Sequence, residues 1–252
     1  MKRILILIGV LAAIAFCAGI AAYIGERIDE KKADTRRLPH KPFGFYERFV
    51  KRPADCFLAT GAMLVLSPVL LLLTVIGAAA MHGNPFFTQE RVGRDGRIFK
   101  LIKFRSMSNK KDKEGNLLPD AERLNAYGKA LRASSLDELP ELANIAKGDM
   151  SIIGPRPLLV KYLDQYNSHD MRRHEVRPGL TGLAQVSGRN TLTWKQKFEK
   201  DVEYVEHVSA SMDFRILGMT VKKVLKREGI EFIVGHQPIM DYFEESKQET
   251  NV

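Results

Sequence analysis

Apolar residues gather in two long runs in the first third of the chain. Residues 4–25 carry no charged side chain over roughly the 20 residues that a membrane-spanning helix needs. Residues 56–81 form a second uncharged run, with Ser67 and Pro68 at its middle. From residue 83 onward, apolar and polar residues mix as in an ordinary folded domain, which is long enough to bury its own core. The pattern therefore predicts two membrane-associated segments followed by a globular domain.

The first run follows Lys2 and Arg3, a basic start shared by membrane anchors and secretory signal peptides. Its length exceeds the apolar region of about 7–15 residues found in a signal peptide. We therefore expect a retained transmembrane helix in residues 1–28, with a cleaved signal peptide as the alternative. Cys17 and Cys56 both fall in or beside the apolar runs, so nothing indicates a disulfide framework or a thiolate metal site.

The second run, in residues 54–82, is expected to bend at its centre. Pro68 has no backbone N–H to donate, and its ring crowds the carbonyl of Leu64. The hydroxyl of Ser67 can donate to a carbonyl freed one turn back, where no water is present to do so. Two structures fit these residues: a kinked helix that spans the membrane, and a re-entrant helix that leaves by the face it entered.

The net charge of +9 is concentrated on both sides of this second run. Nine lysines and arginines lie between residues 27 and 52, mostly in a basic connection over residues 29–53, and six more lie between residues 91 and 105. Basic residues beside membrane segments usually mark the cytoplasmic side. Re-entry keeps both flanks on that side, so the charges favour it. The position of these charges also favours anionic lipid and a phosphorylated substrate as partners. We do not expect a nucleic-acid partner.

A β-hairpin is predicted where Arg94-Asp95-Gly96 separates two short runs, the second of which alternates from Ile98 to Lys103. A polar loop over residues 108–120 follows. Three later stretches have apolar residues at helical spacing, namely residues 137–147, 194–207 and 213–229.

The helix boundaries follow from breakers and composition. Pro140 is tolerated only in the first turn of a helix, so we expect that helix to begin close to Asp137 and to stop at Lys147-Gly148. The stretch 213–229 is strongly amphipathic, which suits packing on the core or on a membrane surface. Residues 235–252 are expected to form a polar tail.

The adjacent carboxylates of Asp137 and Glu138 are the strongest candidate for chemistry. Helix capping alone explains such a pair. However, Arg132 precedes it and Arg156 follows in a Gly-Pro-Arg-Pro segment, and carboxylates beside arginines and a helix N-terminus suit phosphate chemistry or Mg²⁺ binding. Asp201 lies among charged neighbours, which is typical of a solvated side chain. No Walker A motif, dinucleotide fingerprint or Asp-x-Asp motif is present.

Several blocks of the sequence together resemble the bacterial sugar transferases, the monotopic polyprenyl-phosphate phosphoglycosyl transferases. The blocks are KRPADCFLA, the Ser67-Pro68 apolar segment, GNPFFTQERVGRDGRIFKLIKFRSM, LRASSLDELPELANIAKGDMSIIGPRP, RPGLTGLAQVSGRN and KDVEYVEH. The resemblance covers Lys51 to about residue 229. It implies an α/β, helix-rich domain with a re-entrant membrane helix broken at Ser67-Pro68. The catalytic domain, residues 83–234, would face the cytoplasm at the bacterial inner membrane.

The resemblance also implies a reaction. Asp137 would attack the β-phosphate of a UDP-sugar and release UMP, and a polyprenyl phosphate would then take the phosphosugar from the carboxylate. Mg²⁺ at Asp137 and Glu138 would assist. Other positions match family residues that hold phosphate, nucleotide or metal: Lys103, Arg105, Arg132, Arg156, Arg189 and Asp201. The product would begin a surface glycan, such as an exopolysaccharide, a capsule, an O-antigen or the glycan of a glycoprotein.

The chain departs from the family pattern at Glu141 and Ala143, where the family more usually has Gln and a bulky aromatic residue. The sequence does not specify the sugar, and it leaves a homodimer open. Two other functions also stay open. One is a non-catalytic membrane-anchored protein that binds anionic lipid or a partner, and the other is a glycosyltransferase that would release UDP in place of UMP.

Overall fold

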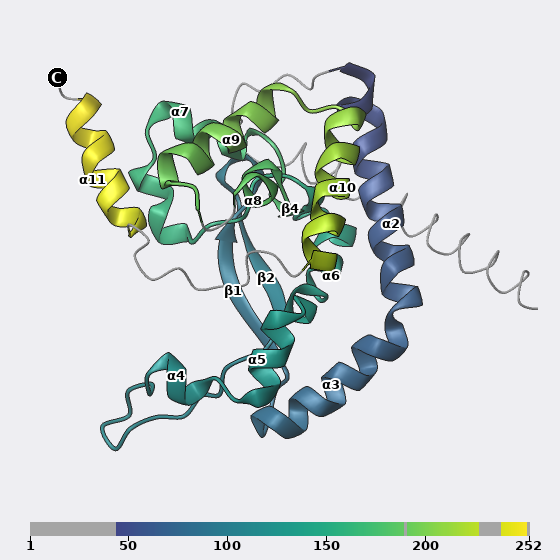
Figure 1. Cartoon of the computed structure of the whole chain (residues 1–252), viewed down its shortest axis with the longest axis vertical. Coiled ribbons are helices and arrows are strands. Elements are labelled where there is room, and N and C mark those ends of the chain that lie inside the picture. The colour runs from purple at the N-terminus through teal and green to yellow at the C-terminus, as the bar shows by residue number, and fades with distance from the viewer. Residues whose placement is uncertain (1–43, 189–190, 227–237, 251–252) are drawn as a thin grey trace, which may run out of the picture.

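The computed structural model describes residues 44–188, 191–226 and 238–250. The predicted transmembrane helix, residues 1–28, lies outside the described residues, as do Arg189 and most of the basic connection. The described part is a helix-rich α/β structure with a short antiparallel hairpin, as the sequence predicts (Figure 1).

A bent pair of helices runs along one side of the molecule (Figure 1). A π-helical turn, η1 (Tyr46–Val50), leads into α2 (Lys51–Val65), and α3 (Ser67–Met81) follows after Leu66. The helix axis bends by 65° between the first arm, Tyr46–Val65, and the second arm, Ser67–Met81. Within the described residues no helix is by itself long and apolar enough to cross a membrane, whereas this pair is when taken together. Both a broken span and a re-entrant loop have this form, so re-entry stays a prediction.

The predicted bend at Ser67-Pro68 is confirmed, together with its cause. Pro68 occupies the first turn of α3, where its missing N–H removes no helical hydrogen bond. The hydroxyl of Ser67 donates to the carbonyl of Leu64 at 2.8 Å, the group that the proline ring crowds. The local sequence therefore contains both the break and the group that satisfies the freed carbonyl.

The two arms differ in how they contact the domain. The start of α2 is buried: Arg52 donates to the carbonyls of Ile145 and Ala146, and Asp55 accepts from the hydroxyl of Ser151. The arm α3 leaves large apolar side chains exposed, namely Val69, Leu71, Leu72, Val75 and Ile76, as does the rest of α2 at Phe57, Leu58 and Val65. Apolar surface of this kind suits contact with lipid.

The hairpin is confirmed. Strands β1 (Phe86–Val92) and β2 (Ile98–Phe104) pair antiparallel, and the short η2 (Arg94–Gly96) joins them. Asp95 has a φ of 57° there, a left-handed conformation that Asp tolerates in turns. A second sheet, which the sequence analysis did not predict, is a parallel pair of β3 (Ser151–Ile153) and β4 (Gly179–Thr181).

The other elements are short helices and turns up to α8, followed by three longer helices. They are α4 (Asp120–Arg123), α5 (Ala126–Ala133), η3 (Leu136–Glu138), α6 (Glu141–Lys147), η4 (Val160–Gln165), α7 (Ser168–Met171), η5 (Arg172–Glu175), α8 (Leu183–Ser187), α9 (Trp194–Glu206), α10 (Ala210–Lys226) and α11 (Ile239–Thr250). The helices predicted from residues 194–207 and 213–229 correspond to α9 and α10.

The helix after the acidic pair begins later than the sequence indicated. Asp137 and Glu138 lie in the separate 3₁₀ turn η3, and α6 begins only at Glu141, with Pro140 as its N-cap. Ser135, with a φ of 56°, reverses the chain just before the turn. The helix ends at Gly148, whose φ is 106°, as predicted.

The end of the chain, expected to be a polar tail, contains a docked helix. Ile239, Tyr242 and Phe243 of α11 are buried in an aromatic cluster around Phe198 of α9. Figure 1 shows α11 at the edge of the molecule, on the same side as α7 and α9. The segment is mostly polar, so its three apolar residues at helical spacing did not indicate a buried helix. They are buried only because α9 offers an apolar surface for them to pack against.

Candidate active site

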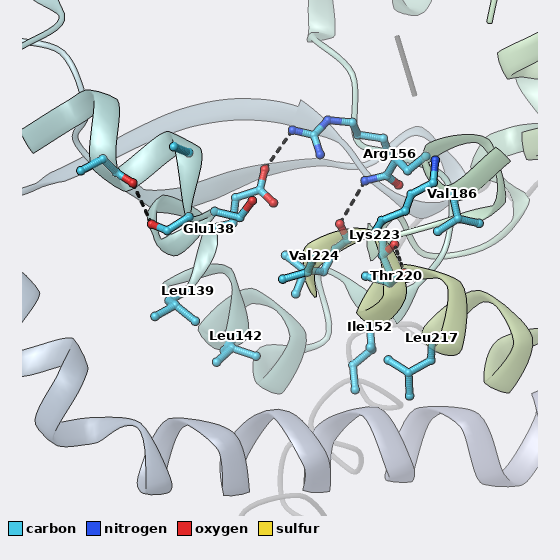
Figure 2. A pocket seen from close by; sticks show the side chains of 17 residues that line it. Glu138, Leu139, Leu142, Ile152, Arg156, Val186, Leu217, Thr220, Lys223 and Val224 are labelled. Carbon is cyan, nitrogen blue, oxygen red and sulfur yellow. Dashed lines mark hydrogen bonds and ion pairs between the residues drawn. The ribbon is translucent and has the colours of Figure 1, made fainter. Parts of the chain in front are cut away.

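The two carboxylates identified from the sequence lie in η3, between α5 and α6. This turn contacts the end of β2, which carries Lys103. The hairpin therefore delivers a lysine to the acidic pair from 35 residues away in sequence. Arg156, in the loop after β3, extends toward Glu138 and forms an ion pair with it (Figure 2).

Glu138 is held by two cations. Its Oε1 accepts hydrogen bonds from Nζ of Lys103 at 2.9 Å and from Nη2 of Arg156 at 3.0 Å. Burial would raise the pKa of Glu138, but the charges and hydrogen bonds of Arg156 and Lys103 outweigh it and lower the pKa to about 2. Glu138 is therefore ionised at neutral pH and fixed in place.

Asp137 has the opposite shift. Burial raises the pKa of Asp137 above its usual value, the negative charge of Glu138 raises it further, and Lys103 and Arg132 offset part of the effect. Two neighbouring carboxylates whose environments push their pKa values apart are suited to different roles. Glu138 carries the ion pairs, and Asp137 is the more basic carboxylate.

A third carboxylate belongs to the same cluster. Oε1 of Glu141, the first residue of α6, lies 3.0 Å from Nζ of Lys103, so this lysine is shared between Glu138 and Glu141. Glu141 is buried, and burial raises its pKa. The sequence analysis marked Glu141 only as a departure from the family pattern. A charged residue in place of an amide was the signal that could have placed it in the site.

The ion pair of Arg173 and Asp201 fixes the main chain at Arg156. Nη2 of Arg173 donates to the carbonyl of Arg156 at 2.8 Å, and the same guanidinium donates to Oδ2 of Asp201 at 3.0 and 2.7 Å. Asp201 is buried, so the expectation of a solvated side chain was wrong. Asp201 acts on the site through Arg173, a residue that the sequence analysis did not identify.

Two further predicted arginines lie near the hairpin. Nε of Arg132 donates to the hydroxyl of Ser106 at 2.8 Å, and its charge lowers the pKa of Asp137. Nη2 of Arg105 donates to the carbonyl of Phe86 at 3.3 Å, where the two strands begin and end. The structure thus brings Lys103, Arg132 and Arg156 to the acidic pair and places Arg105 at the base of the hairpin.

A cavity of about 770 Å³ opens beside the acidic pair. Glu138 and Arg156 line one part of it, and α10 contributes Leu217 and Val224 to the wall (Figure 2). Its volume falls within the range of roughly 300–1,000 Å³ that small-molecule sites occupy. The charge cluster therefore adjoins a mostly apolar cavity.

Comparison with known proteins gives the relationship. The family profile described as "Bacterial sugar transferase" matches residues 46–227, which include the bent helix pair and the whole charge cluster. The chain belongs to the bacterial sugar transferase family. It is 49% identical to an uncharacterized sugar transferase, EpsL, of Bacillus subtilis over 170 residues, which are 67% of this chain and 84% of that protein.

Two further relatives have more informative names. The chain is 36% identical to the exopolysaccharide production protein ExoY of Rhizobium meliloti over 196 residues, 71% of this chain and 87% of that protein. It is 38% identical to the UDP-glucose:undecaprenyl-phosphate glucose-1-phosphate transferase of Escherichia coli over 192 residues, 72% of this chain and 41% of that protein. The match thus spans less than half of the longer E. coli protein.

The ligands that this sugar transferase offers to a metal are few. No group of three or more His, Cys, Asp or Glu side chains among the described residues could hold a metal ion. Asp137 and the second oxygen of Glu138 would supply carboxylate oxygens, because the hydrogen bonds that Glu138 accepts from Lys103 and Arg156 both use Oε1. Because Mg²⁺ is commonly bound by one or two carboxylates plus substrate phosphates, this donor set fits Mg²⁺ only together with a phosphorylated substrate.

Proposed function

We propose that this protein transfers a sugar-1-phosphate from a UDP-sugar to a polyprenyl phosphate and releases UMP. The observation that carries the proposal is the unequal carboxylate pair, with Glu138 held by Lys103 and Arg156 and Asp137 left the more basic. The relatives in E. coli and Klebsiella pneumoniae are named glucose-1-phosphate transferases acting on undecaprenyl phosphate, and one in Erwinia amylovora is named a UDP-galactose-lipid carrier transferase. These names support the same class of reaction.

In the first step, a carboxylate oxygen of Asp137 attacks the β-phosphorus of the UDP-sugar. The bond between this phosphorus and the oxygen that bridges to the α-phosphorus breaks, and its electron pair leaves with UMP. The sugar phosphate is then joined to Asp137 as an acyl phosphate. Lys103, Arg132 and Arg156 surround the pair with positive charge, which stabilises the charge that develops on the phosphoryl oxygens.

In the second step, a phosphate oxygen of the polyprenyl phosphate attacks the phosphorus on Asp137. The bond between this phosphorus and the aspartate oxygen breaks, which regenerates the carboxylate and yields a polyprenyl-diphosphate-linked sugar. Glu138 is a poorer nucleophile than Asp137 because its pKa is low and because one of its oxygens accepts hydrogen bonds from both Lys103 and Arg156. When bound at Asp137 and Glu138, Mg²⁺ would neutralise part of the charge of the diphosphate.

The bent helix pair supports a membrane location for this reaction. The exposed apolar side chains of α3 suit lipid, while the buried start of α2 ties that helix to α6 and β3, the elements next to the active site. We infer that the domain lies on the cytoplasmic face of the bacterial inner membrane, where UDP-sugars are made. There the enzyme would start a surface glycan.

Product analysis tests the proposal. Purified protein in detergent is given a panel of UDP-sugars, polyprenyl phosphate and Mg²⁺, and the released nucleotide is identified. We expect UMP, and we expect labelled sugar phosphate to stay on the protein when acceptor is omitted. Asp137→Asn should abolish both, with Asp120→Asn, an exposed helix-start aspartate, as the matched control.

Other outcomes identify the other functions. Release of UDP would indicate a glycosyltransferase that moves the sugar without its phosphate. Normal surface polysaccharide in cells that carry Asp137→Asn and Glu138→Gln would indicate the non-catalytic lipid-binding or partner-binding protein. Either result would overturn the proposed reaction.

A further inference from the structure

The cavity beside the active site has two chemically different ends. In Figure 2, Arg156 and Lys223 lie along one side of it, whereas Leu139, Leu142, Ile152 and Leu217 lie toward the other, near the bent helix pair. The first end carries Arg156, Lys223 and the carboxylate of Glu138, so its net charge is positive. A cavity with a positively charged end and an apolar end matches an amphiphile, a molecule with an anionic head and a hydrocarbon tail.

The apolar end is continuous with the membrane helix. Leu142 belongs to a buried cluster with Ala59 of α2, and Leu139 and Ile152 pack against the same cluster. Met63 and Leu66, at the last turn of α2 and the bend, join it as well. The wall of the cavity is therefore built on the arm of the bent pair that leads to the membrane break.

The opposite wall opens to the outside through α10. Leu217 and Val224 line the cavity and are also 40% and 61% exposed. Phe214, Val221 and Leu225 of the same helix are 73%, 50% and 79% exposed, so an apolar outer face adjoins the cavity. Leu217 and Val224 therefore connect this outer face with the cavity and offer a hydrocarbon chain an apolar route into it.

Several polar side chains in the wall already form hydrogen bonds within the protein. The hydroxyl of Ser134 donates to the carbonyls of Ala130 and Leu131, and that of Thr220 donates to the carbonyl of Ile216. Nε2 of Gln185 donates to the carbonyl of Leu180. Among the lining residues, Oε1 of Gln185 is the one buried side-chain atom without a partner within the described part of the chain. Away from the charged groups of Glu138, Arg156 and Lys223, most of the lining side chains are apolar, which suits hydrocarbon better than a uracil or sugar ring.

We propose that the apolar end of this cavity binds the part of the polyprenyl chain next to the phosphate, while the phosphate faces Arg156 and Lys223. The inference rests on the proposed function, because the chain belongs to its lipid acceptor. The site orients the acceptor phosphate toward the phosphosugar on Asp137. The rest of the chain extends along α10 toward the lipid.

The test separates the two half-reactions. Val224→Trp and Leu217→Trp place bulk in the cavity, and Met240→Trp introduces the same side chain at an exposed apolar position of α11, outside the cavity lining. With a long polyprenyl phosphate, we expect the cavity variants to raise the acceptor KM roughly tenfold or more, which corresponds to losing the burial of about two methylene groups. In the absence of acceptor, the single equivalent of UMP released per enzyme should form at the wild-type rate, and Met240→Trp should leave the acceptor KM unchanged.

Chain length adds a second measurement. For the wild type, the acceptor KM should fall as successive isoprene units next to the phosphate are added to short prenyl phosphates, and this dependence should weaken in Val224→Trp. An unchanged acceptor KM in both cavity variants would overturn the inference. So would a raised donor KM with a normal acceptor KM, which would assign the cavity to the UDP-sugar. Failure of the wild type to release UMP would instead refute the proposed function itself.

Discussion

Removal of the Asp201 carboxylate should destabilise the protein without weakening donor binding. Asp201 and Arg173 form a buried ion pair, with side-chain exposures of 5% and 2% and a closest distance of 2.7 Å. Asp201→Ala leaves the guanidinium buried without its counter-charge. Loss of one partner of a buried pair costs about 3–5 kcal/mol in the free energy of unfolding. For a protein of this length, that corresponds to a fall of about 6–20 °C in Tm.

The matched control removes both charges. In the double variant Asp201→Leu with Arg173→Met, no buried charge is left unpaired, so the free energy of unfolding should return to within about 2 kcal/mol of the wild type. The carbonyl of Arg156 still loses the hydrogen bond from Arg173. Because the position of Arg156 sets its contact with Glu138, we expect transfer activity to stay roughly tenfold or more below the wild type.

Two measurements check these expectations. Thermal unfolding in detergent gives Tm, and UMP release at varied UDP-sugar gives kcat and the donor KM separately. Asp201→Ala should lower Tm and kcat and leave the donor KM nearly unchanged. If Tm were kept and the donor KM rose instead, Asp201 would contact the substrate, as the family resemblance implied, and the reasoning from the buried pair would be refuted.

Three other predictions follow from single contacts. Pro68→Leu should straighten the bend of the helix pair. If the pair re-enters, tags at residues 40 and 110 are both cytoplasmic in the wild type, and in Pro68→Leu they should report opposite faces of the membrane. Unchanged labelling would mean that the proline does not set the topology. Burial lowers the pKa of His174, so the folded state resists protonation of this side chain. The free energy of unfolding should therefore fall by about 1.4 kcal/mol per pH unit below about pH 6.5, and denaturant titrations should show a weaker pH dependence in His174→Asn. An equal pH dependence in both proteins would contradict the assignment. Glu141→Gln frees Lys103 for Glu138 and should keep UMP release within about threefold of the wild type, whereas Glu138→Gln should lower it by roughly a hundredfold or more; equal losses would make Glu141 an essential member of the cluster.

The features that the sequence predicted depend on residues a few positions apart. Pro68 and Ser67 act on Leu64 within one helical turn, and the turn at Asp95 and the stop at Gly148 are set by local backbone conformation. Amphipathic spacing likewise predicted α9 and α10. Such features need no knowledge of what the segment packs against, because their energies arise within the segment itself.

Within the site, the sequence identified the carboxylates and arginines but not how they are arranged. Asp137 and Glu138 were expected in the first turn of a helix, whereas Pro140 caps α6 and leaves them in a separate turn. The helix α11 was missed because its three apolar residues acquire a role only against Phe198.

The amino-acid sequence by itself thus determined the helix break and the hairpin, and its resemblance to the family named Asp137 as the candidate nucleophile of this sugar transferase. Only the tertiary structure decided that Glu138 forms ion pairs with Lys103 and Arg156, and that an apolar cavity adjoins Glu138. It also decided that Asp201 supports Arg156 through Arg173. The physical reason is that desolvation and charge pairing depend on groups brought together from distant segments. A pKa shift or a cavity wall is a property of that assembly, and neither is encoded in any one stretch of the chain.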